Sequence, residues 1–290
     1  MTGREAVERH RSLGWPFNAA GIRSFVRDEG AGEPVVCMHG VPVSCFLYRK
    51  MLPELAARGL RGVAFDLPGL GFADRRPALD YTWTGLGRFA RAAVDSLGLH
   101  RFHLVVHDVG GPVGFELAAA TPERVLSLTV LNTLIEVDTF KRPWSMEPFA
   151  IRGVRFVWLW SLTRASWRAF FHLQGIKNHR AVPRSEIDAH LELLRRVDGG
   201  RSFLRIMRGF ERTPEKRELY ASALEGPYPV QVVWGEHDPT LLVKVQGEQA
   251  RRAAGLDEIH TLPAKHFLPE DQAPAIAERV AALAASAGRD

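Results

Sequence analysis

VVHDVGG, at residues 105–111, is the stretch of sequence that decides the fold. Its β-branched residues favour a strand, and they run directly into a carboxylate followed by glycines. This pattern predicts a strand that turns sharply into a helix, with Asp108 held at the turn and the glycines letting the helix pack close. A carboxylate held there is a candidate nucleophile that displaces a group from sp3 carbon, whereas serine or cysteine would indicate acyl transfer. The competing interpretation of Asp108 is a helix N-cap.

Strand and helix signals alternate around this elbow, which predicts an α/β fold with a mostly parallel central sheet flanked by helices. We expect strands at residues 22–27, 35–38, 61–65, 102–107, 125–131, 230–234 and 258–262. Apolar residues at helical spacing predict helices at residues 47–57, 86–97, 110–120, 187–197, 203–210, 241–254 and 273–285. A chain of 290 residues is long for one core and short for two, which favours one domain with an insertion.

The alternation stops between residues 136 and 226. This segment has little strand signal, several helical periods and four of the seven tryptophans. We therefore expect a helical cap at residues 136–226, inserted into a core domain that consists of residues 1–135 and 227–290.

The composition is that of an ordinary globular chain, with 46% hydrophobic and 24% charged residues. No apolar run approaches the roughly 20 residues of a membrane span, so we expect no membrane association. Residues 1–13 lack the apolar core of a secretory signal, which leads us to expect a cytoplasmic protein. Cys37 and Cys45 are the only cysteines, so we expect reduced core residues and neither a disulfide framework nor a zinc site.

The net charge of +5 raises the question of nucleic-acid binding. Residues 136–226 hold 17 Lys and Arg against 11 Asp and Glu, so the positive excess belongs to the expected cap. These cations are scattered at helix-like spacings without an RNA- or DNA-binding motif, which favours a solvated helical surface over a phosphate track. We expect no nucleic-acid partner, and the sequence indicates no particular oligomeric state.

Three polar groups follow predicted strands, at the sheet edge where ligands bind in open α/β folds. Asp108 follows the strand at 102–107, Asp238 follows the strand at 230–234, and His266 follows the strand that ends at residue 262. Their chain order of nucleophile, acid and histidine is typical of the α/β-hydrolase fold. The competing interpretations are an Asp-Pro turn for Asp238 and a surface histidine for His266.

Four segments carry a resemblance to a known family: HGVPVS at residues 39–44, DLPGLGFADR at 66–75, HDVGG at 107–111 and HFLPED at 266–271. Together they resemble the haloalkane dehalogenase and epoxide hydrolase branch of the α/β-hydrolase superfamily, which uses an aspartate nucleophile. The resemblance implies that Asp108 attacks carbon to give an alkyl ester. It also implies that His266, oriented by Asp238, activates the water that hydrolyses this ester. The backbone N–H groups of Val41 and Val109 are then the expected oxyanion hole.

The leaving group decides between the activities of that branch, because a halide needs N–H donors and an opening epoxide needs an acidic O–H. Dehalogenases of the family usually carry tryptophan after the nucleophile, where this chain has Val109. Our candidates for the missing donor are Trp158, Trp160 and Tyr220. The sequence favours a dehalogenase-like hydrolase of a small organic substrate, with epoxide hydrolysis or a non-catalytic ligand-binding protein as the alternatives. It contains no metal, nucleotide or flavin motif, so we expect water to be the only co-reactant and no cofactor.

Overall fold

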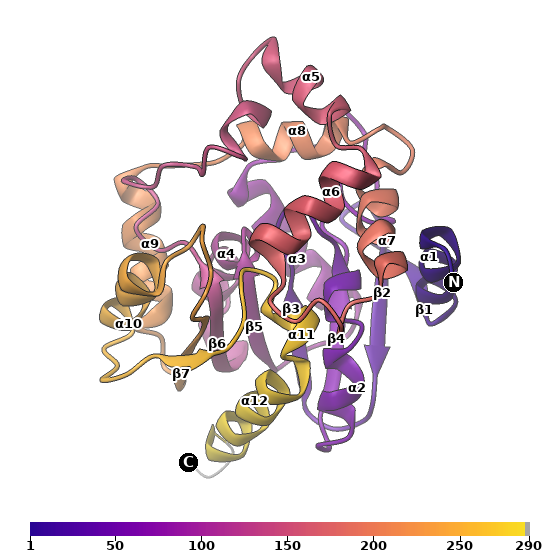
Figure 1. Cartoon of the computed structure of the whole chain (residues 1–290). Helices are drawn as coiled ribbons and strands as arrows, with labels where there is room; N and C mark the ends of the chain where they lie inside the picture. The colour runs from indigo at the N-terminus through magenta and orange to yellow at the C-terminus, as the bar shows by residue number, and fades with distance from the viewer. Residues whose placement is uncertain (288–290) are drawn as a thin grey trace.

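The protein is built around one β-sheet, and the order of its strands determines which segments meet at its edge. The computed structural model of the protein describes residues 1–287. Within that range eight strands are ordered β1-β2-β4-β3-β5-β6-β7-β8; the β1–β2 and β2–β4 pairs are antiparallel, and the other pairs are parallel (Figure 1). The strands are β1 (Gly14–Ala19), β2 (Ile22–Glu29), β3 (Pro34–Met38), β4 (Arg61–Phe65), β5 (Phe102–Asp108), β6 (Val125–Thr133), β7 (Val230–Gly235) and β8 (His260–Leu262).

The seven predicted strands are confirmed, and β1 is the strand that the sequence analysis missed. β1 contains Pro16 and is mostly exposed, so it lacks the apolar run of a central strand. Ala20 and Gly21 join it to β2, and both have positive φ angles, 48° and 72°. A two-residue loop with these angles is a type I′ hairpin turn. The first position of this turn is Ala20 and not the usual asparagine, so the sequence lacks the Asn-Gly pattern that predicts such a turn.

Helices cover both faces of the sheet, which is why its central strands are continuous apolar runs. On one face, α2 (Met51–Ala56) packs against α12 (Ala273–Ala287). On the other, consecutive contacts join α3 (Trp83–Ser96), α4 (Gly110–Ala120), α9 (Pro214–Leu224) and α10 (Glu248–Ala253). Residues 288–290, the end of the expected core range 227–290, lie outside the described residues.

The segment between β6 and β7 supplies the helices above the carboxyl ends of the strands. They are α5 (Val154–Trp160), α6 (Arg164–Phe170), α7 (Arg184–Arg195) and α8 (Arg201–Arg208), which lie at the top and right of Figure 1. The helix α9 also belongs to the range 136–226, yet it packs against α4 and α10 of the core. The inserted segment therefore rejoins the core layers before β7 begins.

Several helix predictions differ from the structure at their ends. The predicted helix 47–57 is a 3₁₀ turn, Cys45–Tyr48, followed by α2, and the helix 241–254 is a π turn, Val243–Gly247, followed by α10. The predicted helices 187–197 and 203–210 each lie two or three residues earlier, as α7 and α8. The helix α1 (Gly3–Ser12) was not predicted, although Thr2 and Glu5 form a capping box at its start and were a readable signal.

Candidate active site

Asp108 lies at a strained elbow between β5 and α4. It is the last residue of β5 and has a φ angle of 52°, a left-handed conformation that costs free energy for a residue with a side chain. The hydroxyl of Thr133, at the end of the neighbouring strand β6, donates to the backbone carbonyl of Asp108 at 2.5 Å and fixes this turn. A side chain at Gly111 would overlap Thr133, so glycine is required for α4 to approach β6. This backbone conformation places the Asp108 carboxylate at the end of the sheet.

The structure brings together the three predicted catalytic side chains. His266 Nδ1 donates to Asp238 Oδ2 at 2.8 Å, and His266 Nε2 lies 3.3 Å from Asp108 Oδ2. The side chain of Asp238 is fully buried, whereas that of Asp108 is 16% exposed. The imidazole thus bridges an inner carboxylate and one that faces a cavity, which is the arrangement of a nucleophile, a base and an orienting acid.

Opposite charges set the protonation states of this group. Burial opposes a charge on His266, but the Asp238 and Asp108 carboxylates outweigh it and raise the pKa of His266 to about 10. Burial likewise raises the pKa values of Asp108 and Asp238, yet contact with His266 lowers both below their ordinary range. At neutral pH, therefore, an imidazolium lies between two carboxylates, and Asp108 is ionised.

The loop after β3 supplies a donor to the nucleophile. The backbone N–H of Val41 donates to Asp108 Oδ1 at 2.7 Å. A side chain at Gly40 would overlap Asp108 Oδ1, so only glycine lets the loop come this close. The N–H of Val109 also lowers the pKa of Asp108 by hydrogen bonding. Asp108 Oδ1 is consequently held by the Val41 N–H, and Oδ2 faces His266.

Asn132, in β6, is a partner of the acid that the sequence analysis did not assign. Its Nδ2 donates to Asp238 Oδ2 at 2.6 Å, and its Oδ1 accepts from the Gly235 N–H at 2.8 Å. The second oxygen of Asp238 accepts from Thr240 N–H, Thr240 Oγ1 and Leu241 N–H, at 2.7–3.0 Å. Asn132 therefore fixes Asp238 relative to β7 and favours its ionised form. The position of Asn132 at a strand end was the available signal.

Two further histidines lie near the site and position the backbone. His107 Nε2 donates to the backbone carbonyl of His266 at 2.8 Å, and burial lowers the pKa of His107 to about 4, so this ring is neutral. His39 accepts from the Leu67 N–H at Nε2, at 3.0 Å, and its Nδ1 lies 2.9 Å from the Gly40 carbonyl. Each ring orients a loop that carries a site residue.

Asp108 and His266 open onto a small cavity of about 50 Å³ with mainly apolar walls, such as Leu134, Phe170 and Phe267. A second apolar cavity of about 280 Å³ shares Phe170 and Gln174 with it and extends beneath α5 and α6. Arg142 also lines the first cavity. The sequence analysis did not identify it, because nothing in the sequence distinguishes it from the other arginines of residues 136–226. The site thus offers a mainly apolar space for a small organic group.

The structure places the three predicted leaving-group donors away from Asp108. Trp160 is 74% exposed and points into solvent. Trp158 lines the second cavity, and its indole N–H already donates to the Ser145 carbonyl at 3.1 Å. Tyr220 is buried, and its hydroxyl donates to Glu116 at 3.2 Å. These positions correct the expectation that one of these side chains meets the leaving group.

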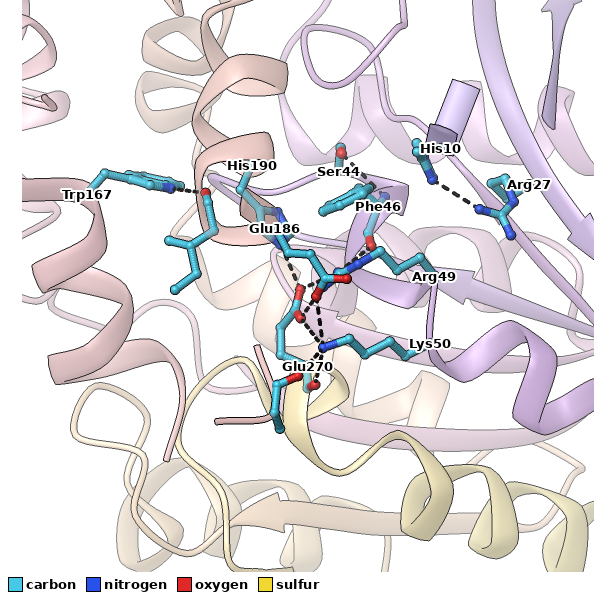
Figure 2. Close-up of polar contacts among 12 residues, drawn as sticks. His10, Arg27, Ser44, Phe46, Arg49, Lys50, Trp167, Glu186, His190 and Glu270 are labelled. Carbon is cyan, nitrogen blue, oxygen red and sulfur yellow. Dashed lines mark hydrogen bonds and ion pairs between the residues drawn. The ribbon is translucent and has the colours of Figure 1, made fainter. Parts of the chain in front are cut away.

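A buried charge cluster joins the short helix α11 (Leu268–Asp271), which follows His266, to α7 (Figure 2). Arg49 donates to both oxygens of Glu270, at 2.6 and 2.7 Å, and to Glu186 at 2.5 Å. His190 Nε2 donates to Glu270 at 2.7 Å, and Lys50 lies 3.1 Å from Glu186. Because Glu186 and His190 belong to α7, this cluster connects the core to the inserted helices close to His266.

Within residues 1–287, no group of three or more His, Cys, Asp or Glu side chains is arranged to hold a metal ion. Of the helices that the structure describes, none is long and apolar enough to cross a membrane. Cys37 and Cys45 are both free and buried, as the sequence predicted.

The sequence matches known proteins along most of its length. A family model described as alpha/beta hydrolase fold matches residues 33–273. A haloalkane dehalogenase from Mycobacterium marinum is 27% identical over 284 residues, which cover 89% of this chain and 88% of that protein. A haloalkane dehalogenase from Psychrobacter cryohalolentis is 38% identical over 117 residues, a match that spans only 39% of either chain.

Solved structures repeat the same architecture. Haloalkane dehalogenase DbeA from Bradyrhizobium elkani superposes with a TM-score of 0.77 at 21% identity, covering 95% of this chain and 98% of that one. Epoxide hydrolase CorEH superposes with a TM-score of 0.78 at 20% identity, covering 94% and 98%. At these identities the similarity concerns the fold alone.

Proposed function

The chain belongs to the α/β-hydrolase fold family, and we propose that it is a haloalkane dehalogenase-like hydrolase that works through a covalent alkyl ester on Asp108. One observation carries the proposal: the Asp108 carboxylate lies within reach of both the Val41 N–H and the His266 imidazole. A carboxylate held in this way is ionised and faces an apolar cavity. These are the conditions under which it attacks carbon.

In the first step Asp108 Oδ2 attacks the carbon that bears the leaving group. The new C–O bond forms as the carbon–halogen bond breaks, and the halogen departs with the electron pair. No proton moves. Because the apolar walls exclude water, the carboxylate is less solvated than in bulk and the attack is favoured. The substrate is a small organic molecule whose apolar part fits the two adjoining cavities.

In the second step neutral His266 removes a proton from water, and the hydroxide attacks the ester carbonyl carbon, Cγ of Asp108. The tetrahedral intermediate then collapses: the bond between Cγ and the alkyl oxygen breaks, and the alcohol leaves with the proton that His266 returns. Esterification removes the negative charge of Asp108, so one of the two carboxylates that raise the pKa of His266 is lost. The imidazolium then releases its Nε2 proton to solvent more readily, and the neutral imidazole is a competent base. The N–H groups of Val41 and Val109 stabilise the tetrahedral intermediate on Asp108 Oδ1.

The inserted segment completes the site in this account. We assign residues 136–226 to a cap whose helices α5–α8 cover the reaction, although α9 packs on the core. Residues of this segment, such as Phe170, wall the catalytic cavity, so the cap determines which substrates fit. The cytoplasmic location and the absence of a nucleic-acid partner, both expected from the sequence, remain part of this proposal.

The test is to trap the intermediate in a His266→Ala variant. This variant keeps the nucleophile and lacks the base, so the ester accumulates. The variant is incubated separately with a panel of haloalkanes and a panel of epoxides, and the intact mass is recorded. An adduct equal to the haloalkane less hydrogen halide supports dehalogenation, whereas an adduct equal to a whole epoxide supports the alternative of epoxide hydrolysis. Binding of ligands from both panels without any adduct would indicate a non-catalytic binding protein.

A further inference from the structure

Arg142 is a buried cation in the wall of the catalytic cavity. It belongs to the segment between β6 and α5 and lines the same cavity as Asp108 and His266. Its side chain is only 6% exposed. Burying a guanidinium costs free energy unless its N–H donors are hydrogen-bonded. A buried arginine in a mainly apolar cavity is therefore a candidate for a functional role.

The guanidinium of Arg142 is held in place and yet incompletely satisfied. One Nη2–H donates to the Met207 carbonyl at 2.8 Å, and one Nη1–H donates to Glu147 at 3.3 Å. The group lies over the ring of Phe210, with Cζ 4.6 Å from the ring centroid. Nε is buried and has no hydrogen-bond partner among the described residues. Two of the five N–H groups of arginine are therefore used, so the hydrogen-bonding capacity of this buried cation is only partly met.

Thr240 and His266, two other polar side chains of this cavity, are held by carboxylates. The Thr240 hydroxyl donates to Asp238, and His266 is held by both carboxylates. Gln174 accepts from Ser145 through its side-chain oxygen. Within the described residues, no tryptophan or tyrosine lines this cavity. Apart from the His266 imidazolium, which both carboxylates hold, Arg142 is thus the cationic donor that lines this cavity when charge moves onto the leaving group.

We propose that Arg142 binds the halide that Asp108 displaces. This assignment rests on the proposed function, and it supplies the N–H donor that the halide leaving group needs. As the carbon–halogen bond breaks, the negative charge leaves Asp108, which becomes a neutral ester, and appears on the halide. The positive charge of Arg142 is present before the reaction and needs no reorganisation, so it stabilises the transition state more than the bound substrate.

The chemistry of a guanidinium fits a halide better than an opening epoxide. A halide departs as a stable anion and needs only hydrogen bonds and positive charge. An epoxide oxygen must instead receive a proton, and arginine holds its protons in proteins. Arg142 therefore favours dehalogenation over epoxide opening at this site.

Glu147 limits the strength of this anion site and provides a variant that acts in the opposite direction. It is the carboxylate partner of Arg142, it is 44% exposed, and its oxygen lies 3.3 Å from Nη1. A halide beside Arg142 is repelled by this carboxylate. Replacing Glu147 with glutamine is expected to strengthen halide binding by about threefold, because a charge of the same sign is removed.

The first experiment titrates sodium bromide into the full-length wild type and follows binding by calorimetry. We expect Arg142→Gln to weaken bromide binding at least tenfold and Glu147→Gln to strengthen it. Arg208→Gln is the matched control, because Arg208 is an exposed arginine of α8, next to Met207, and has no place in the site. Equal bromide affinity in all four proteins would overturn the assignment, whether or not the enzyme dehalogenates.

The second experiment measures the rate of ester formation with 1-bromopropane and with 2-bromopropionate, using the His266→Ala background. We expect Arg142→Gln to slow alkylation by both compounds by about 100-fold, the usual loss on removing a transition-state donor. Arg142→Lys should lose less, because it keeps the charge. If only the reaction of 2-bromopropionate slows, Arg142 binds a substrate carboxylate and the halide assignment is wrong. If the background protein forms no adduct at all, the proposed function fails while the bromide titration still tests Arg142.

If Arg142→Gln does not fold, which thermal unfolding reveals, the other two variants decide the question. The proposal then requires Arg142→Lys to retain bromide binding and Glu147→Gln to strengthen it. A Glu147→Gln variant with unchanged bromide affinity, together with an Arg142→Lys variant that no longer binds bromide, would contradict the proposal.

Discussion

Replacing Glu270 with glutamine is expected to destabilise the protein strongly, because the cluster in Figure 2 depends on its charge. Glu270 is fully buried and accepts from Arg49 Nη1, Arg49 Nη2 and His190 Nε2. Glutamine keeps the shape but brings an NH₂ group toward these donors and leaves the Arg49 charge only partly compensated by Glu186. Removing one partner of a buried pair costs about 3–5 kcal/mol. At about 2 °C per kcal/mol for a chain of this size, Tm should fall by roughly 6–10 °C.

The pH dependence of this loss has a definite sign. Burial opposes ionisation of Glu270, but Arg49 and the hydrogen bond from His190 hold its pKa below the ordinary value of 4.5. A group whose pKa is lowered by folding contributes stability that is present above its unfolded pKa and is lost as the pH falls. The difference in stability between the wild type and Glu270→Gln should therefore be largest near neutral pH and shrink below about pH 4.5.

The assay is chemical and thermal unfolding of both proteins between pH 3 and pH 8. Glu54→Gln is the control, since Glu54 and Arg58 form an ion pair with side chains 36% and 28% exposed. Such a pair contributes about 0–1 kcal/mol, so Tm should change by no more than roughly 2 °C. A Glu270→Gln variant that unfolds like the control at neutral pH would refute the reasoning, because the cluster would then contribute no more than a surface pair.

Three further predictions concern the site itself. Asn132→Leu removes a hydrogen bond to the Asp238 carboxylate that is worth about 1.5–3 kcal/mol. Hydrolysis of the ester should therefore slow by about 10- to 100-fold, while the rate of alkylation changes little; rapid quenching and mass analysis measure both rates. Asp108→Asn removes one of the two carboxylates beside His266, so the pKa of His266, measured by NMR titration, should fall below about 10; an unchanged pKa would mean that Asp108 does not interact with the imidazole. Trp160→Ala should leave kcat/KM within about twofold, because Trp160 is 74% exposed, and a large loss would restore it as a leaving-group donor.

The sheet and the meeting of Asp108, Asp238 and His266 could be predicted from the sequence because their signals are local. The elbow at Asp108 is encoded by a strand, a carboxylate and glycines that are neighbours in the chain, and the apolar runs of the parallel strands are equally local. Asp238 and His266 each follow such a strand directly. Parallel strands end at one edge of the sheet, so the order of the strands was sufficient to bring the three side chains together.

The donor for the leaving group and the cluster at Glu270 could not be predicted, because they depend on contacts between distant segments. Arg142 is buried and Arg208 is exposed, and this difference arises from the side chains that pack against each arginine in the folded protein. Helical periodicity identifies buried faces in regular helices, but Arg142 lies in an irregular segment. Trp160 was a reasonable candidate by residue type, yet α5 turns it to solvent. A residue type indicates what a side chain does chemically, and the tertiary packing decides where it does so.

The most direct test of the ester mechanism is a single turnover in oxygen-18 water, with the wild-type enzyme in excess over a bromoalkane. If Asp108 is the nucleophile, the alcohol from this first turnover carries unlabelled oxygen from the carboxylate. The label from water then enters Asp108 and is found in the peptide that contains it. An alcohol that carries oxygen-18 from the first turnover, with an unlabelled Asp108 peptide, would contradict the account and show that water attacks the substrate directly.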